Sequence, residues 1–277
     1  MIKIGFIDYY LDEWHANNYP ALLKEASDGE MEVAYAYAMI DSPIGGMTTK
    51  EWCNKYKIPQ CLTIEELIEK SDVIVVLSPD NCEMHEELCQ LPLRSKKPVY
   101  VDKTFAPDKE TAIRIFEIAQ QSGTPCYSTS ALRFAAEYQK IDPAGVQMLN
   151  SWGGGSFETY SIHQLEPIMM LMKAPAKRIM SNKGKKWLCM TIEFKDGRVA
   201  TLSQMEDGAP FMMNVCSDKG NSVVNVQSDF FKAFIAELVK FFKTGVVPVP
   251  HEQTVEIMAL REKGIQALQC PGVWVEL

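Results

Sequence analysis

The sequence of 277 residues is short of positive charge, and this shortage excludes several classes of partner. Lysine and arginine total 28 against 36 aspartates and glutamates, so the formal net charge is −8. Nucleic acids and anionic membranes attract positively charged surfaces, so we expect neither as a partner. The chain also lacks a run of about 20 apolar residues, which a membrane-spanning helix needs.

Paired cysteines are missing as well. None of the eight cysteines forms a C-x-x-C pair. Structural zinc sites typically use that spacing, so its absence argues against such a site and we expect no metal. With 47% apolar residues the chain can bury a core without a disulfide framework. The apolar run at residues 2–7 is too short for a signal peptide. We therefore expect reduced thiols and a cytoplasmic protein.

Short apolar runs alternate with helical patterns over the first 130 residues. The expected strands cover 2–7, 32–39, 72–77, 98–101 and 125–128. Helices are expected over 14–25, after a capping box at Thr63, over 83–91, and from Pro107 to Gly123. This alternation predicts a Rossmann-like, doubly wound parallel sheet over residues 1–130. Ligands of such sheets bind beyond the carboxyl ends of the strands, so the loops after Ile7, Leu77 and Val101 surround one crevice.

The second half has a different pattern. Strands are expected over 186–194, 198–206, 211–217 and 223–226, with a hairpin turn at Asp196-Gly197, and helices over 230–245 and 252–268. Consecutive hairpins predict an open antiparallel sheet. We therefore expect an α/β protein whose second domain, residues 131–277, has an α+β fold and serves substrate binding and oligomerisation.

Three motifs in this order resemble those of the Gfo/Idh/MocA oxidoreductases. Ser78-Pro79-Asp80 stands where that family has Thr-Pro-Asn, and Asp102-Lys103-Thr104 where it has Glu-Lys-Pro. Gly153-Gly154-Gly155 is followed by His163 and then Glu166, at a spacing similar to the family's. The resemblance implies hydride transfer between NAD or NADP and a sugar, cyclitol or related polyol. It also implies a homodimer or homotetramer formed through the C-terminal sheet.

The resemblance assigns roles to particular residues. Lys103 and His163 correspond to catalytic positions, because a histidine with a pKa near 6.5 suits proton transfer and a lysine suits it when burial or a nearby cation lowers its pKa. The cofactor-binding positions are Asp8, Tyr9, Ser78, Pro79, Asp102 and Lys103, and the substrate-binding positions are Arg133, Tyr160 and Glu166.

Each assignment has a structural alternative. Lys103 is otherwise a solvated lysine paired with Asp102, and His163 a core histidine bonded to the backbone. Arg133 is otherwise the partner of an acid. Glu166 either orients His163 or, followed by Pro167, caps a helix. The remaining histidines, His15, His85 and His251, are expected on the surface.

The departures from the family are in the cofactor motif. Where the family has G-x-G-x-x-G, this chain runs from Gly5 to Glu13 with no further glycine, and it carries two tyrosines and three acids instead. These side chains fill the space of a diphosphate and repel it. The acid expected at the end of the second strand is replaced by Tyr37, with Asp41 the nearest acid. An alternative function is therefore a non-catalytic ligand-binding or regulatory relative that has lost dinucleotide binding, and a third is an enzyme that works without a dinucleotide.

Overall fold

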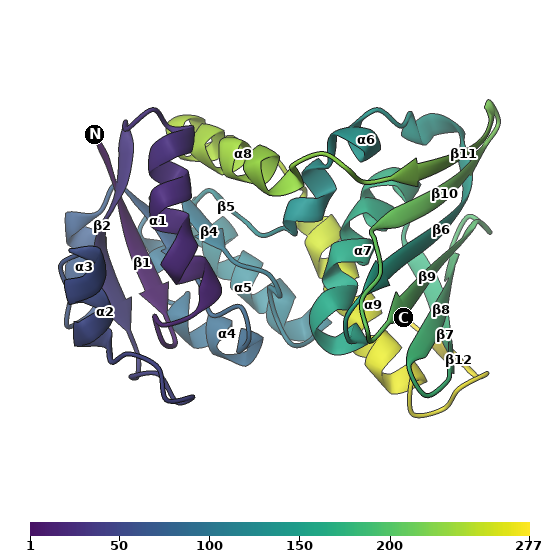
Figure 1. The fold of residues 1–277 in the computed structure, drawn as a ribbon, viewed down its shortest axis with the longest axis horizontal. Coiled ribbons are helices and arrows are strands. Elements are labelled where there is room, and N and C mark those ends of the chain that lie inside the picture. Colours follow the sequence, from purple (N-terminus) through teal and green to yellow (C-terminus); the bar gives the residue numbers. More distant parts are fainter. The chain divides into compact units, whose positions relative to one another are not determined.

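The computed structural model describes all 277 residues, which form two compact units (Figure 1). The first unit consists of residues 1–128 and 235–251, and the second of residues 129–234 and 252–277. The chain therefore passes between the units three times. The sequence analysis did not anticipate that residues 235–251 return to the first unit.

The first unit contains a sheet of five parallel strands. These are β1 (Ile2–Asp8), β2 (Met31–Ala38), β3 (Val73–Val76), β4 (Val99–Val101) and β5 (Cys126–Tyr127), in the order β2-β1-β3-β4-β5. All four residues of β3 are buried, as expected for a continuous apolar run in a sheet covered on both faces. The order of the strands reverses direction after β1, which confirms the predicted Rossmann-like, doubly wound sheet.

The connecting helices confirm most of the predicted elements in this half. They are α1 (Trp14–Ala26), α2 (Thr49–Tyr56), α3 (Ile64–Lys70), α4 (His85–Leu88) and α5 (Lys109–Ser122). The helical spacing of Ala112, Ile115, Phe116 and Ala119 predicts a buried stripe on α5, and all four are buried. Gly123 ends the helix in the left-handed conformation. Its start is corrected, because Asp108 caps the helix and Pro107 precedes the cap.

Two further local predictions need correction. The helix expected over 83–91 is a 3-10 turn, Cys82–Met84, followed by the single turn of α4. Thr63 does cap α3, but the Glu66 carboxylate accepts from Leu62 N rather than from Thr63 N, so the capping box there is incomplete. A reciprocal capping box lies instead between Thr48 and Glu51 at the start of α2.

The second unit contains a seven-stranded sheet. Its strands are β6 (Val146–Gly154), β7 (Ala176–Lys183), β8 (Trp187–Phe194), β9 (Val199–Met205), β10 (Met212–Ser217), β11 (Gly220–Asn225) and β12 (Trp274–Glu276). Their order is β11-β10-β6-β9-β8-β7-β12. The sheet is mixed rather than antiparallel, because β6 pairs in parallel with β9. Hairpins join only strands that are adjacent in sequence, whereas β6 reaches β9 across a long connection.

Helices cover one face of this second sheet. They are α6 (Ala136–Gln139), α7 (Phe157–Met172) and α9 (His251–Ala267), and Figure 1 shows α7 and α9 on the same side of the strands. Inward side chains such as Leu149 and Ile192 are fully buried. The remaining helix, α8 (Phe230–Thr244), begins in the second unit and ends in the first, where Phe241 contacts Tyr127. None of the helices combines the length and apolar character needed to cross a bilayer.

Candidate functional site

Three buried carboxyl groups gather at the carboxyl edge of the parallel sheet. Asp8 ends β1, Asp102 follows β4, and Glu13 immediately precedes α1. Burial, together with the nearby charges of Glu13 and Asp102, raises the pKa of Asp8 well above its ordinary value. The Oδ2 atom of Asp8 is buried and has no hydrogen-bond partner. The edge at which such sheets bind their ligands is therefore acidic, and it contains an unsatisfied polar atom.

Glu13 occupies the N-terminus of α1 with its own side chain. Its carboxylate accepts a hydrogen bond of 2.6 Å from the amide of His15 and another from the amide of Ala16. The first amides of a helix have no partner within the helix, and the helix dipole favours a negative charge there. In dinucleotide-binding sheets the cofactor diphosphate is held at this place. Here the chain supplies the anion itself.

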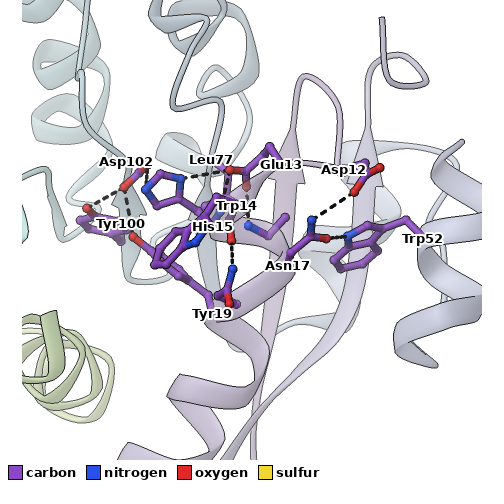
Figure 2. Close-up of polar contacts among 12 residues, drawn as sticks. Asp12, Glu13, Trp14, His15, Asn17, Tyr19, Trp52, Leu77, Tyr100 and Asp102 are labelled. Atoms are coloured by element: carbon purple, nitrogen blue, oxygen red, sulfur yellow. Dashed lines mark hydrogen bonds and ion pairs between the residues drawn. The ribbon is translucent and has the colours of Figure 1, made fainter. Parts of the chain in front are cut away.

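The imidazole of His15 lies between two of the acids (Figure 2). Its Nδ1 is 3.0 Å from Glu13 Oε2, and its Nε2 is 3.7 Å from Asp102 Oδ2. Two phenols contact the other oxygen of Asp102, Tyr100 at 3.0 Å and Tyr19 at 3.4 Å. The prediction that His15 lies on a solvated helix face is wrong, because its side chain is only 14% exposed and faces a carboxylate with each ring nitrogen.

A second network fills the edge near the end of β2. Asp12 accepts from the amide of Met47 at 2.7 Å and from the side-chain amide of Asn17 at 3.1 Å. The oxygen of Asn17 accepts in turn from the buried indole N–H of Trp52 at 2.8 Å, as Figure 2 shows. A Cβ atom at Gly46 would lie 2.4 Å from the Asp12 carboxylate, so glycine lets the loop close on Asp12.

These residues do not fit the diphosphate and adenosine ribose of NAD or NADP. The amides that would bind the diphosphate already bind Glu13. Asp41, the acid nearest to the end of β2, accepts instead from the amide of Thr49 at 2.7 Å. Tyr10, one of the two tyrosines in this stretch, is buried. The chain's own groups therefore occupy the helix amides that would bind the diphosphate, and they engage the acid nearest to the ribose position.

The predicted cofactor-binding positions all lie in the loops that follow β1, β3 and β4. They are Asp8, Tyr9, Ser78, Pro79, Asp102 and Lys103. The hydroxyl of Ser78 donates to the carbonyl of Asn81 at 3.0 Å. Lys103 is half-buried, and the peptide bond that follows it is cis. The alternative of a solvated lysine paired with Asp102 is wrong, since Asp102 is buried among Tyr19, Tyr100 and His15.

In the second unit, His163 lies on α7 beside a hydroxyl group. Its Nδ1 is 2.7 Å from the Oγ of Ser130, and its ring centroid is 5.3 Å from that of Tyr160. Glu166 follows one turn later and accepts from the amide of Ser130 at 3.2 Å. The carboxylate of Glu166 therefore acts on the same short segment as His163, and the group that directly contacts the imidazole is the serine hydroxyl.

Arg133 and Glu166 form a buried ion pair. The Arg133 Nε donates to Glu166 Oε2 at 2.5 Å, and Nη2 donates to Gln253 Oε1 at 2.9 Å. Thr129 donates to the same carboxylate at 3.2 Å. Arg133 is therefore the partner of an acid, which was the structural alternative to substrate binding. The capping interpretation of Glu166 is wrong, because α7 begins at Phe157 and Pro167 lies inside it.

The other two histidines are not surface residues either. His85 is fully buried, with Nδ1 3.0 Å from the carbonyl of Phe105, and burial lowers its pKa. His251 is half-buried, stacks on Phe116, and has its Nε2 2.7 Å from the carbonyl of Cys126. Neighbouring acids in the sequence suggested solvent exposure, but tertiary contacts with backbone carbonyls decide both positions.

Four residues at this acidic edge were not among the predicted site residues, although Glu13 was one of the acids expected to repel a diphosphate. These are Glu13, His15, Tyr19 and Tyr100. A usable signal was present, because an acid and a histidine directly after a buried parallel strand lie at the ligand-binding edge of the sheet. No group of three or more histidine, cysteine, aspartate or glutamate side chains has the arrangement of a metal site.

Comparisons with known proteins define the class of fold. No sequence-family profile matches the chain, and no curated protein is similar to it in sequence. Among solved structures, a probable dehydrogenase from Thermotoga maritima has a TM-score of 0.81 at 15% identity, over 99% of this chain and 98% of that one. The myo-inositol dehydrogenase of Lactobacillus casei, in complex with NAD(H) and myo-inositol, has a TM-score of 0.79 at 14% identity, over 100% and 96%.

A third structure agrees with these two. The myo-inositol dehydrogenase of Corynebacterium glutamicum has a TM-score of 0.78 at 15% identity, over 100% of this chain and 98% of that one. The chain therefore shares the fold of these three dehydrogenases along its whole length.

Proposed function

We propose that this chain is a divergent protein of the Gfo/Idh/MocA type that binds a small polar ligand at the carboxyl edge of its parallel sheet and has lost dinucleotide binding. The observation that carries the proposal is the carboxylate of Glu13 on the amides of His15 and Ala16. A dinucleotide would have to displace this covalently attached anion and then lie next to Asp8 and Asp102.

The same groups favour a ligand rich in hydroxyl groups. Asp8 is buried, its pKa is raised, and its Oδ2 has no partner. A carboxyl oxygen without a partner can accept a hydrogen bond from a hydroxyl group in either protonation state. A phosphate or carboxylate ligand would instead be repelled by Glu13 and Asp102. The proposed ligand is therefore an uncharged polyol or a related small molecule.

Calorimetric titration of the full chain with NADH and NADPH tests the proposal. We expect the wild-type protein to bind neither dinucleotide at concentrations up to about 1 mM, because Glu13 occupies the helix amides. A Kd of about 1 mM corresponds to a binding free energy of only about 4 kcal/mol. The variant Glu13→Gly removes the resident carboxylate and should bind ADP-ribose measurably. Glu25→Gly, an exposed position on the same helix, is the matched control and should behave like the wild type. Micromolar binding of either dinucleotide to the wild type would refute the proposal.

A second candidate is an NAD(P)-dependent oxidoreductase for a sugar, cyclitol or related polyol. Two observations favour it: the whole-chain likeness to inositol dehydrogenases, and the contact of His163 with the hydroxyl of Ser130. Ser130 and Tyr160 would orient the imidazole of His163 for transfer of a substrate hydroxyl proton. Lys103 would contact the same substrate oxygen.

Turnover measurements distinguish the two candidates. The assay follows the reduction of oxidised NAD or NADP by myo-inositol, scyllo-inositol and glucose. The oxidoreductase candidate requires turnover that falls at least about 100-fold in Lys103→Ala and in His163→Ala, a typical loss for acid–base groups. Lys140→Ala, at an exposed position, is the control and should keep full turnover. The absence of turnover together with the absence of dinucleotide binding would eliminate this candidate.

A further inference from the structure

A separate pocket lies within the second unit. It has a volume of about 270 Å³ and is bounded by the start of α7, the hairpin between β7 and β8, the end of β9 and the end of α9. Its volume equals that of about nine water molecules at about 30 Å³ each, which suits a small ligand. None of His163, Arg133 and Glu166 lines it. The pocket is therefore distinct from the residues discussed above.

Trp187 forms an aromatic wall of this pocket. It is the first residue of β8, and it is 50% exposed although indoles are usually buried. A Cβ atom at Gly184 would lie 2.3 Å from its Nε1, so only glycine there allows the indole to rest on the hairpin. Gly184 is not among the residues with a positive φ, which leaves this close contact as its structural role.

Gln204 provides an unsatisfied polar group in the same wall. The residue is 1% exposed, and its Nε2 donates to the carbonyl of Ser156 at 3.3 Å. Its Oε1 is buried and has no partner. A buried acceptor without a donor is unfavourable, so a ligand N–H at this atom would recover the lost hydrogen bond.

The charges of the pocket are mainly negative. Glu158 and Glu206 line it, and neither carboxylate has an ion pair or a hydrogen bond. Lys183 is the one basic residue in the lining, and its Nζ donates to the carbonyl of Leu268 at 2.7 Å. The lining therefore has a net charge of −1. The lining groups without a partner therefore include three acceptors, the two carboxylates and Gln204 Oε1, beside the indole N–H of Trp187 as a donor.

We propose that this pocket binds a small organic cation that carries a primary ammonium or guanidinium group. Such a group donates hydrogen bonds to Gln204 Oε1 and pairs with Glu158 and Glu206. It also interacts favourably with the face of an indole, here Trp187. A phosphorylated or carboxylated ligand is disfavoured by the two acids, and an uncharged sugar would leave their charges uncompensated.

Titration of the full-length protein with agmatine and with putrescine tests this site, by calorimetry and by tryptophan fluorescence. We expect a Kd below about 1 mM. Added salt should weaken the binding, because ion pairs at a partly exposed site are screened. The double variant Glu158→Gln/Glu206→Gln should weaken binding at least about tenfold. So should Trp187→Ala, and so should Gly184→Ala, which displaces the indole without removing it.

Matched variants exclude general effects of charge and fluorescence. Glu65→Gln removes an exposed acid on α3, and Trp152→Ala removes another exposed indole from the second unit. Both should bind agmatine within twofold of the wild type. The proposal is overturned if neither amine binds the folded wild type with a dissociation constant below about 1 mM. It is also overturned if the pocket variants bind the amines as tightly as the wild type does. Binding of glucose or myo-inositol at this pocket in place of the amines would also overturn it.

Discussion

At the scale of single residues, buried acids in this protein differ in their partners. Arg133 and Glu166 form a buried ion pair in which each is the main partner of the other. Asp8 has no positively charged group bonded to it, and burial raises its pKa. These two arrangements lead to different predictions.

Breaking the buried pair should be costly. Glu166→Gln leaves the guanidinium of Arg133 uncompensated, and we expect the free energy of unfolding to fall by about 3 kcal/mol. Urea denaturation measures this change. The control is Asp207→Asn, which breaks the exposed pair between Asp207 and Lys186 and should change stability by less than about 0.5 kcal/mol. Equal effects of the two variants would contradict the distinction between buried and exposed pairs.

The raised pKa of Asp8 predicts a pH dependence of stability. In the unfolded chain the carboxyl loses its proton near the ordinary pKa of 3.8, whereas the folded protein holds it to higher pH. Stability therefore falls as pH rises from about 4 towards the folded pKa, by at most about 1.4 kcal/mol per pH unit. Asp8→Asn lacks this loss, so its stability relative to the wild type should increase across that range. A difference independent of pH, measured by urea denaturation at each pH, would contradict the prediction.

At the scale of secondary-structure elements, one side chain joins α1 to α2. Asn17 bonds the buried indole N–H of Trp52 and also the carboxylate of Asp12. Asn17→Ala leaves the indole donor without a partner, and we expect a loss of about 2 kcal/mol in the free energy of unfolding. Asn18→Ala removes a bond to the carbonyl of Trp14 at an exposed position of the same helix and should cost much less. Thermal unfolding of the two variants provides the comparison.

Elements differed in how far the sequence could predict them. β3 was evident because Val73–Val76 is a continuous apolar run, and the stripe of α5 was evident from its helical spacing. β6 was missed because polar residues interrupt its apolar ones without a regular alternation and glycines end it. Its parallel pairing with β9 has no local signal, since the two strands are 45 residues or more apart in the chain.

The candidate site was predicted in outline only. The loops after β1, β3 and β4 were expected to form the ligand-binding edge, and the acids there were expected to oppose a diphosphate. What the sequence could not show is the target of each acid. Glu13 is bonded to the helix amides and Asp12 to the amide of Met47, and both contacts depend on the folded backbone.

At the scale of the whole molecule, the association of copies stays a prediction. The outer face of β6 carries Met148 and Trp152, and Trp152 is 48% exposed. We propose that this face forms a homodimer or homotetramer, and an interface of ordinary size buries about 1,600 Å². Sedimentation velocity should show an oligomer for the wild type and a monomer for Trp152→Lys. Leu62→Lys, an exposed apolar position in the first unit, should stay oligomeric. A monomeric wild type would contradict the proposal.

The chain crosses between its two units three times, and this has a consequence for protein engineering. A gene fragment ending at Ser128 would omit the Phe241 ring of α8, which contacts Tyr127, and the His251 imidazole, which meets the Cys126 carbonyl. Transplanting the parallel sheet into another host therefore requires residues 235–251 to be grafted alongside it, through a new linker or a permuted order of segments.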